Sequence, residues 1–403
     1  RSAGVEELAR PVGTYLENGV FKLHNYYDFT SLGGYLTLEY ELTQNGETVQ
    51  SGSIETPDLA PHAEAEIAIP YTLPDSGVCC LNVYYRLKEE DDFREAGYLL
   101  GFDQFVLREE KAAFAAGPAQ KISVRETERS FIVEGDGFRY VWNRLTGTFD
   151  TLTSDQISFL DKPMEWNIWR APTDNDRNIR REWERAGYDR STPRVYESSA
   201  EQVDDAVVLK ARLSLSAIYL QPCLTMQAVW TILPDGRISA NIHVDRTKDF
   251  PYLPRFGLRL FLPRAFDAVE YFGYGPFESY SDKHRASLLG KYETTVAQEH
   301  EDYLRPQENS SHYGCSHLAV ADPDGGCLEA VGDSFSFNTS VYTQEELATK
   351  AHNYELEPCG STVLCLDYKL SGIGSNSCGP QLLPQYQLNE ESFDFAMELR
   401  LGK

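Results

Sequence analysis

Basic residues are scarce in this sequence. Its 403 residues include 37 Lys and Arg against 62 Asp and Glu, which gives a formal net charge of −25 and an isoelectric point near 4.7. Nucleic acids and anionic membrane surfaces both select for Lys and Arg. The charge balance therefore excludes the nucleic-acid-binding and membrane-surface classes of protein.

Long apolar runs are also missing. No stretch approaches the roughly 20 apolar residues of a membrane span. The first residues, RSAGVEELARPVG, lack the charged and then apolar regions of a signal peptide and contain no initiating methionine. We therefore expect a cytoplasmic protein without a membrane partner, and interpret the chain as a piece of a longer one.

Cysteine pairs with the spacing of metal or redox motifs are absent from the sequence. The eight cysteines form no Cys-x-x-Cys pair and no zinc-like cluster with histidine. This predicts free, reduced thiols and no metal site. Cys378, between Ser377 and Gly379, is a candidate nucleophile, but nothing in the sequence supplies its base.

Strands alternating with amphipathic helices are not found, which excludes a (β/α)₈ barrel and a dinucleotide fold. Short runs rich in β-branched and aromatic residues follow one another instead. About seven such runs in the first hundred residues, with a hairpin signal at Asn45–Gly46, predict an immunoglobulin-like β-sandwich over residues 1–107. The charged, small and Gly-Pro residues of 108–121 predict a linker.

Strand-like runs resume at Ile122 and continue almost to the end. They predict a large antiparallel, multi-sheet sandwich over residues 122–403, and hence an all-β protein of two domains. Only NIRREWERAGYD, residues 178–189, has a helical pattern, with Gly187 as its stop signal.

The stretch WRAPTDNDR, residues 169–177, combines an aromatic residue, arginine, aspartates and an asparagine. Asp174, Asp176 and Asn178 occupy positions 1, 3 and 5 of a calcium loop, but Ile179 and Arg185 stand where its glycine and bidentate glutamate belong. A local ion pair of Arg170 with Asp174 or Asp176 is the alternative. An ordered loop that fixes domain packing or borders a pocket is the preferred interpretation.

Three further loops mix turn residues with polar and aromatic side chains, a composition typical of sugar-binding surfaces. They are GYGPFESYSDK (273–283), RPQENSSHYG (305–314) and GIGSNSCGP (372–380). Glu278, Tyr280 and Asp282 alternate as residues on one face of a strand edge would. Glu308 and Asn309 lie near His312 and His317, which makes an acid–base pair conceivable.

These motifs, in this order and together with LPRFGLRLFLP, resemble the C-terminal region of bacterial β-galactosidases of glycoside hydrolase family 2. FKLHNYYDFTSL and GFDQFVL resemble the sandwich domain that precedes it in the same enzymes. The resemblance covers essentially the whole chain. It implies that residues 122–403 form a β-supersandwich related in fold to galactose mutarotases, which packs against a catalytic (β/α)₈ barrel and lends a loop to the substrate pocket.

The resemblance also implies what this chain lacks. Retaining glycosidases use two carboxylates about 5–5.5 Å apart, and in this family both belong to the barrel, so no catalytic residue is expected here. The implied partners are the barrel, the upstream domains and a galactoside, in an enzyme expected to be a homo-oligomer. No cofactor is expected in this chain, and the ions suggested for the whole enzyme are Mg²⁺ and Na⁺ or K⁺.

Two sets of site residues are predicted on this basis. The expected substrate-binding residues are Ser375, Asn376, Ser377 and Cys378, the last standing where some relatives have tryptophan. The expected pocket or domain-packing residues are Arg170, Asp174, Asn175, Asp176, Glu278, Glu308 and Asn309.

Two other functions are compatible with the sequence. One is a free-standing mutarotase-like epimerase that uses His312 or His317 as acid and Glu308 or Glu278 as base. The other is a carbohydrate-binding module without catalysis.

Overall fold

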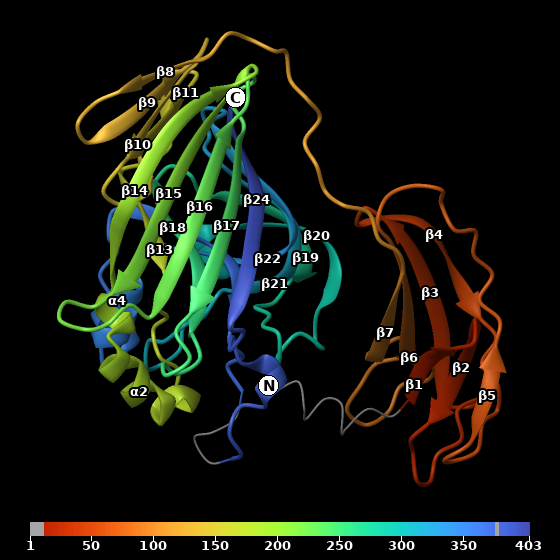
Figure 1. Ribbon diagram of the computed structural model, residues 1–403. Helices are drawn as coiled ribbons and strands as arrows, with labels where there is room; N and C mark the ends of the chain where they lie inside the picture. The colour runs from red at the N-terminus through yellow and green to blue at the C-terminus, as the bar shows by residue number, and fades with distance from the viewer. Residues whose placement is uncertain (1–11, 375–378) are drawn as a thin grey trace. The chain divides into compact units, whose positions relative to one another are not determined.

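The computed structural model describes residues 12–374 and 379–403. It divides the chain into two compact units, one reaching to Glu110 with the addition of Arg285–Lys291, the other comprising Lys111–His284 and Tyr292–Lys403. Strands dominate both units (Figure 1), which confirms the predicted all-β class. In the described part of the chain, no helix combines the length and apolar character of a membrane span.

The first unit is a sandwich of two antiparallel sheets (Figure 1). Its sheets have the strand orders β1-β2-β5 and β4-β3-β6-β7. The strands are β1 (Val12–Glu17), β2 (Val20–Asn25), β3 (Leu36–Gln44), β4 (Glu47–Ile54), β5 (Glu64–Ile67), β6 (Cys79–Leu87) and β7 (Leu99–Arg108). Alternate residues of β3, such as Leu38 and Tyr40, are buried, as period-2 patterning requires.

The predicted hairpin between β3 and β4 is confirmed. Asn45 and Gly46 have φ values of 50° and 86°, and a two-residue loop that matches strand twist needs positive φ at both positions. Strand β1 was not predicted from the sequence, because its apolar and polar residues do not alternate strictly.

The second unit contains a 5-stranded sheet and a 12-stranded sheet. The smaller sheet has the order β12-β11-β10-β9-β8. Its strands are β8 (Ser123–Glu126), β9 (Ser130–Glu134), β10 (Phe138–Asn143), β11 (Thr148–Ser154) and β12 (Ile157–Ser158).

The larger sheet follows the path β13-β18-β23-β22-β24-β17-β16-β15-β14, with β21 paired to β22, and β19 to β21 and β20. Its strands are β13 (Lys162–Asn167), β14 (Thr192–Val203), β15 (Ala206–Ser216), β16 (Leu224–Ile232), β17 (Ile238–Arg246), β18 (Arg255–Pro263), β19 (Ala268–Gly275), β20 (Leu288–Thr295), β21 (His312–Ala321), β22 (Cys327–Ser340), β23 (Ser361–Leu370) and β24 (Ser392–Gly402). This is the predicted supersandwich.

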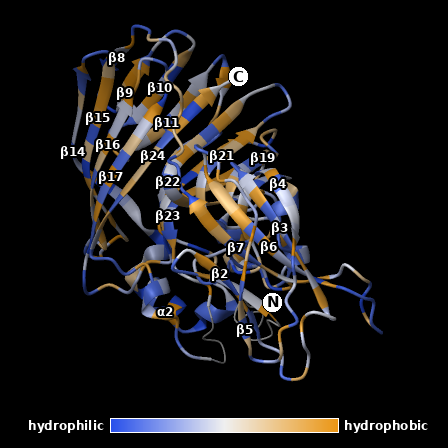
Figure 2. Ribbon diagram, turned by 90° about the vertical axis from the view of Figure 1, so that its right-hand side faces the viewer, coloured by the Kyte–Doolittle hydropathy of each residue, from blue (hydrophilic) through white to orange (hydrophobic). Residues whose placement is uncertain are grey.

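The hydrophobic core of the second unit is made of the buried side chains of its strands. Figure 2 shows hydrophobic and hydrophilic residues alternating along β15, β16 and β24. Trp142 and Trp230 are fully buried, and the Phe149 ring meets the Trp230 ring edge-on at 5.2 Å. Large aromatic side chains bury the most apolar surface, so they fix how the strands pack.

Helix α2 (Ile179–Ala186) confirms the predicted helix. It ends at Gly187, whose φ is 76° and where a Cβ atom would lie 2.4 Å from the Ala217 Cβ, so only glycine fits. Its buried Trp183 donates to the Tyr252 carbonyl at 2.8 Å. Two short helices were not predicted, α3 (Val296–Glu299) and α4 (Gln344–Thr349), and neither were the 3₁₀ turns η1 (Asp174–Arg177), η2 (Tyr188–Arg190), η3 (Asn353–Glu355) and η4 (Pro384–Tyr386).

The division at residues 1–107, 108–121 and 122–403 stays a prediction that limited proteolysis can check. Trypsin should cut first after Lys111, because the ion pair of Lys111 with Asp333 is exposed and the adjoining backbone belongs to no strand or helix. Beyond that point, the Gly117 amide donates to Asp235 Oδ2 at 2.8 Å. Sequencing of the first product should therefore begin at Ala112.

Lys210 is the matched control. Its side chain is half exposed, but its backbone is paired in the centre of β15 on both sides. An initial cut at Lys210 or within another strand would contradict the proposed linker.

Candidate functional site

The loop 169–177 is organised around the Arg170 side chain, which is completely buried. Its guanidinium donates to Asp176 Oδ1 at 2.7 Å and Oδ2 at 3.1 Å, and to the carbonyls of Ser371 and Gly372, the latter at 3.0 Å. Burial lowers the pKa of Arg170, but Asp176, Glu308 and Tyr252 together raise it by more, so the group stays charged. The predicted ion pair of Arg170 thus forms with Asp176.

The ion pair between Arg170 and Asp176 determines which contacts the two aspartates of this loop make. Both Asp176 oxygens face Arg170, and the Thr173 amide donates to Oδ2 at 2.9 Å. Asp174 opens the turn η1, where its amide donates to Gln307 Oε1 at 3.0 Å. The calcium-loop geometry is therefore not formed, and the described residues contain no group of three or more His, Cys, Asp or Glu placed to hold a metal ion.

Two more side chains hold the segment 371–374. Asn175 Nδ2 donates to the carbonyls of Ile373, at 2.8 Å, and Gly374. Asp282 accepts the amide protons of Ile373 at 3.1 Å and Gly374 at 2.7 Å. Three of the loops identified in the sequence, 169–177, 273–283 and 372–380, therefore meet at this segment.

Glycines make this close approach possible. A Cβ atom at Gly372 would lie 2.5 Å from the Asp282 Cγ, and one at Gly374 would lie 2.9 Å from a Leu382 methyl group. Those distances are shorter than any real contact, so a side chain at either position would push Asp282 or Leu382 away. Asp282 was not among the predicted site residues, although the two glycines two residues apart signal a backbone that another group approaches.

A second buried arginine joins the fourth loop to the sheet. Arg255, at the start of β18, donates from Nε to Asp367 Oδ1 at 3.0 Å, and it also pairs with Asp367 Oδ2. It donates to Asn338 Oδ1 at 2.7 Å and to both Glu308 oxygens at 3.3 Å. Burial lowers its pKa, but Asp367 and its neighbours raise it well above the usual value. Sequence reasoning missed Arg255, whose signal is a charge within the apolar run LPRFGLRLFLP.

Glu308 lies between the two arginines and is fully buried. Burial raises its pKa, Arg255 and Arg170 oppose the rise, and Asp367 and Glu278 reinforce it, so that the pKa reaches about 7. The two 3.3 Å hydrogen bonds from Arg255 are long for charge-assisted bonds, which explains why they do not offset desolvation. The Glu308 amide donates to the Ala171 carbonyl at 2.9 Å, which joins loop 305–314 to loop 169–177.

Glu278 and Asn309 are also buried within the loops. Glu278 accepts hydrogen bonds from Lys283, Tyr303 and the Ser310 amide. Asn309 accepts from the Glu301 amide at 3.2 Å and donates to the Gln307 carbonyl at 2.9 Å. Both side chains therefore hold backbone and neighbouring loops in place.

The predicted strand edge over Glu278, Tyr280 and Asp282 is wrong. The segment is a loop with one isolated bridge, Tyr280 to Lys283, and Glu278 and Tyr280 are buried. Hydrogen bonds to Lys283 and Ser310 turn the chain at this point, so the alternation over five residues does not correspond to a strand.

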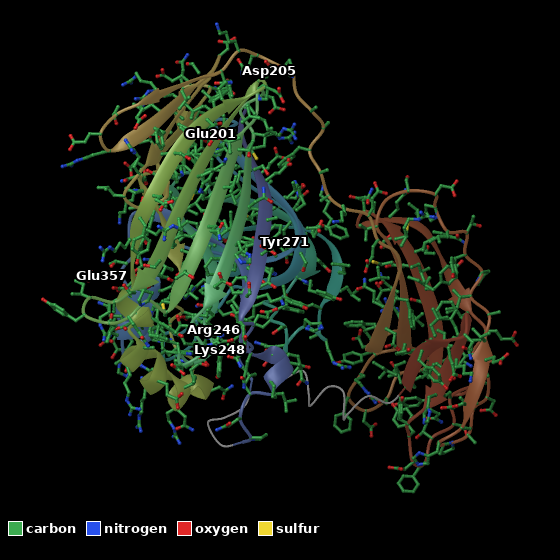
Figure 3. The ribbon with its side chains drawn as sticks, viewed as in Figure 1. Glu201, Asp205, Arg246, Lys248, Tyr271 and Glu357 are labelled. Atoms are coloured by element: carbon green, nitrogen blue, oxygen red, sulfur yellow. The ribbon has the colours of Figure 1, made fainter. Side chains whose placement is uncertain are left out.

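The two histidines of the epimerase alternative have other partners. His312 Nε2 pairs with Glu299, its Nδ1 faces the Tyr274 carbonyl at 3.2 Å, and its ring packs 4.2 Å from that of Tyr271, labelled in Figure 3. His317 lies 3.6 Å from Glu329. Hydrogen bonds from His317 and Arg400 lower the pKa of Glu329 to about 2. Neither Glu308 nor Glu278 pairs with a histidine in the described part of the chain.

The predicted substrate-binding residues Ser375, Asn376, Ser377 and Cys378 lie outside the described residues. The segment that leads into them, residues 371–374, is the one that Arg170, Asn175 and Asp282 hold. The structure thus brings together Arg170, Asn175, Asp176 and Glu308 of the predicted packing set at one end of the second unit.

The second unit is a β-supersandwich whose loops are held by buried ion pairs. Residues 134–399 match the family described as β-galactosidase small chain, and residues 21–108 match β-galactosidase domain 4. The chain belongs to the β-galactosidase family. The resemblance inferred from its motifs is confirmed.

Two β-galactosidases of other organisms agree with this assignment. A β-galactosidase of Actinobacillus pleuropneumoniae is 40% identical over 99% of this chain, and one of Staphylococcus xylosus is 33% identical over 94%. The chain spans 40% and 38% of those two proteins, about two fifths of their length. Among solved structures, galactose 1-epimerase of Lactobacillus acidophilus aligns over 71% of this chain and all of its own, with a TM-score of 0.40 and 9% identity.

Replacing Arg170 should lower the stability of the second unit. Arg170→Met leaves the Asp176 carboxylate buried without its cation and two carbonyls without a donor, which should lower the free energy of unfolding by about 3–5 kcal/mol. The matched control is Arg212→Met, since Arg212 forms a surface ion pair with Glu197 and should cost about 0.5 kcal/mol or less. Urea denaturation measures both, and equal losses would contradict the role assigned to Arg170.

Stability should depend on pH through Glu308. Its pKa rises from 4.5 to about 7 on folding, so between these values the folded chain holds a proton that the unfolded chain has lost. Stability from this group is therefore present below pH 4.5 and is lost as the pH rises to 7. Glu308→Gln cannot lose a proton, so its stability relative to the natural chain should increase by about 1–3 kcal/mol over this range.

The measurement is the free energy of unfolding of both proteins at several pH values from 4.5 to 8. Other titrating groups cancel in the difference, provided that they behave alike in the two proteins. A difference that does not vary with pH would show that Glu308 has an ordinary pKa.

Proposed function

We propose that this chain is the non-barrel portion of a β-galactosidase, which hydrolyses terminal β-D-galactose residues from β-galactosides such as lactose in the whole enzyme. The observation that carries the proposal is the convergence of loops 169–177 and 273–283 on the segment that precedes residues 375–378, with loop 305–314 joined to loop 169–177, in a chain of the β-galactosidase family. Such a portion shapes the galactoside pocket and makes the domain and subunit contacts of the whole enzyme.

The remaining parts of the proposal concern partners. The chain works with a catalytic (β/α)₈ barrel and the upstream domains, in a homo-oligomeric enzyme that uses Mg²⁺ and Na⁺ or K⁺. Its length, about two fifths of the relatives it matches, supports such a division. Residues Ser375, Asn376, Ser377 and Cys378 are the part that borders the substrate.

The alternative of an aldose epimerase has less support. Proton transfer at the anomeric centre needs an acid and a base that face the same sugar. His312 and His317 are instead paired with Glu299 and Glu329, and Glu308 is paired with Arg255. Polarimetry on fresh α-galactose distinguishes this function, because an epimerase accelerates the change in rotation over buffer.

The proposal predicts that the chain alone does not hydrolyse a chromogenic β-galactoside. The buried carboxylates Asp176, Glu278 and Glu308 are each bound to a cationic side chain, which leaves none of them as a nucleophile and acid pair. Addition of the missing upstream portion as a separate polypeptide should restore turnover. Activity of the chain alone that disappears in Glu278→Gln would contradict the proposal.

The restored enzyme also tests the bordering residues. Asn376→Ala should lower kcat/KM by about tenfold or more, equivalent to about 1.4 kcal/mol of transition-state stabilisation. Asn353→Ala, in the exposed turn η3, is the matched control and should leave kcat/KM unchanged. Equal kinetics for Asn376→Ala and the natural chain would exclude that residue from the pocket without affecting the rest of the proposal.

A further inference from the structure

The second unit contains a cavity that no step of the proposed function uses. Its volume is about 490 Å³, within the range of about 300–1,000 Å³ typical of small-molecule sites. Residues from the loop 276–283, from β22 and β23, and from the segment 384–390 line it. Several separate segments of the fold therefore contribute to one hollow.

The floor of the cavity is made of small hydroxyl side chains and a tyrosine. Ser311, Ser336 and Tyr280 are buried there, Ser336 on strand β22. Tyr313 adds an aromatic face, and its ring stacks on Tyr274 at 5.9 Å with an interplanar angle of 17°. Hydroxyl groups both donate and accept, which suits a ligand that carries hydroxyl groups of its own.

The rim is a segment with amide and aromatic side chains that the protein holds firmly. Gln385, Tyr386 and Asn389 line the cavity. The Gly372 amide donates to the Tyr386 carbonyl at 2.8 Å, and the Leu388 amide donates to Ser371 Oγ at 2.8 Å. A rim fixed in this way needs little ordering when a ligand binds.

Arg246 fixes the far end of the same rim. It lies at the end of β17 (Figure 3) and donates to the carbonyls of Asn389 at 3.2 Å and Glu390 at 3.3 Å. Both ends of the segment 386–390 are thus held by side-chain or backbone hydrogen bonds.

The charges in the wall cancel. Lys369 Nζ donates to Glu390 Oε1 at 2.6 Å. Burial lowers the pKa of Lys369 and this contact raises it. The net change is an increase, so Lys369 stays charged. An ion-paired wall gives neither an anion nor a cation a net attraction. The lining is therefore polar and close to neutral.

Two lining residues have an unused polar atom. Ser281 Oγ and Glu390 Oε2 are buried and have no hydrogen-bond partner within residues 12–374 and 379–403. Both atoms are covered by protein, so each would reach a molecule in the cavity by rotation of its side chain. Buried polar atoms usually have partners, and a hydroxyl-bearing ligand supplies them.

We propose that this cavity binds a neutral polyhydroxylated molecule of the size of a monosaccharide. Hydroxyl and amide groups in the floor and rim bond its hydroxyls, and Tyr313 and Tyr386 offer rings to its apolar face. This binding belongs to the chain itself and needs neither a barrel nor hydrolysis, so it stands independently of the proposed function.

The test is isothermal titration calorimetry of the 403-residue chain with D-galactose and D-glucose as probes. Saturable binding of at least one sugar is expected, with a dissociation constant on the order of 1 mM. Galacturonate should bind at least about fivefold more weakly than galactose, since its carboxylate gains no net attraction from the neutral wall. Equal or tighter binding of galacturonate, or no saturable binding of either sugar, would overturn the proposal.

Variants then locate the binding. Gln385→Ala and Tyr386→Ala alter the rim and should each raise the dissociation constant about fivefold or more. Tyr354→Ala, which removes a tyrosine that is 79% exposed outside the cavity, should leave the constant unchanged. Ser336→Leu should fill the floor and abolish binding, and its melting temperature shows whether it folds.

Gln385 is exposed, so its variant keeps the proposal testable if Ser336→Leu does not fold. Sugar binding that Gln385→Ala and Tyr386→Ala leave unchanged would place the sugar elsewhere and refute the assignment of this cavity.

Discussion

Burial of two guanidinium groups is the constraint on which the loop end of the second unit depends. Arg170 and Arg255 are both without solvent exposure, and a buried charge without partners costs several kcal/mol. Asp176 and Asp367 supply the opposite charges, and Glu308 accepts two further hydrogen bonds from Arg255. The remaining protons go to two backbone carbonyls from Arg170 and to Asn338 Oδ1 from Arg255. Because these partners come from four parts of the chain, the loops satisfy both arginines in only a narrow set of arrangements.

The segment 371–374 transmits this constraint in two directions. Arg170, Asn175 and Asp282 bind its carbonyl and amide groups on one side. On the other, the Gly372 amide and Ser371 Oγ bind the rim of the cavity. The loop end and the cavity thus share one strip of backbone. Replacement of Arg170 would therefore be felt at the cavity rim as well as in the loops.

The sequence predicted what depends on neighbouring residues and missed what depends on distant ones. Alternation of buried and exposed residues predicted most strands, and Asn45–Gly46 and Gly187 predicted a hairpin and a helix end, because each is decided within a few positions. Arg170 contacts carbonyls about 200 positions away, and Asp282 holds amides about 90 positions away. No local pattern encodes such pairs. The order and type of the motifs still identified the family, because that inference does not require knowing which distant residues are in contact.

The hydrogen bonds of the segment 371–374 determine what it can offer a neighbouring molecule. Its carbonyls at Ser371, Gly372, Ile373 and Gly374 accept protons from Arg170 and Asn175, and its amides at Ile373 and Gly374 donate to Asp282. Backbone groups engaged in this way cannot be the main hydrogen-bonding partners of a sugar. The segment therefore provides a fixed position, and under the function proposed above, contact with a galactoside falls to the side chains that follow it.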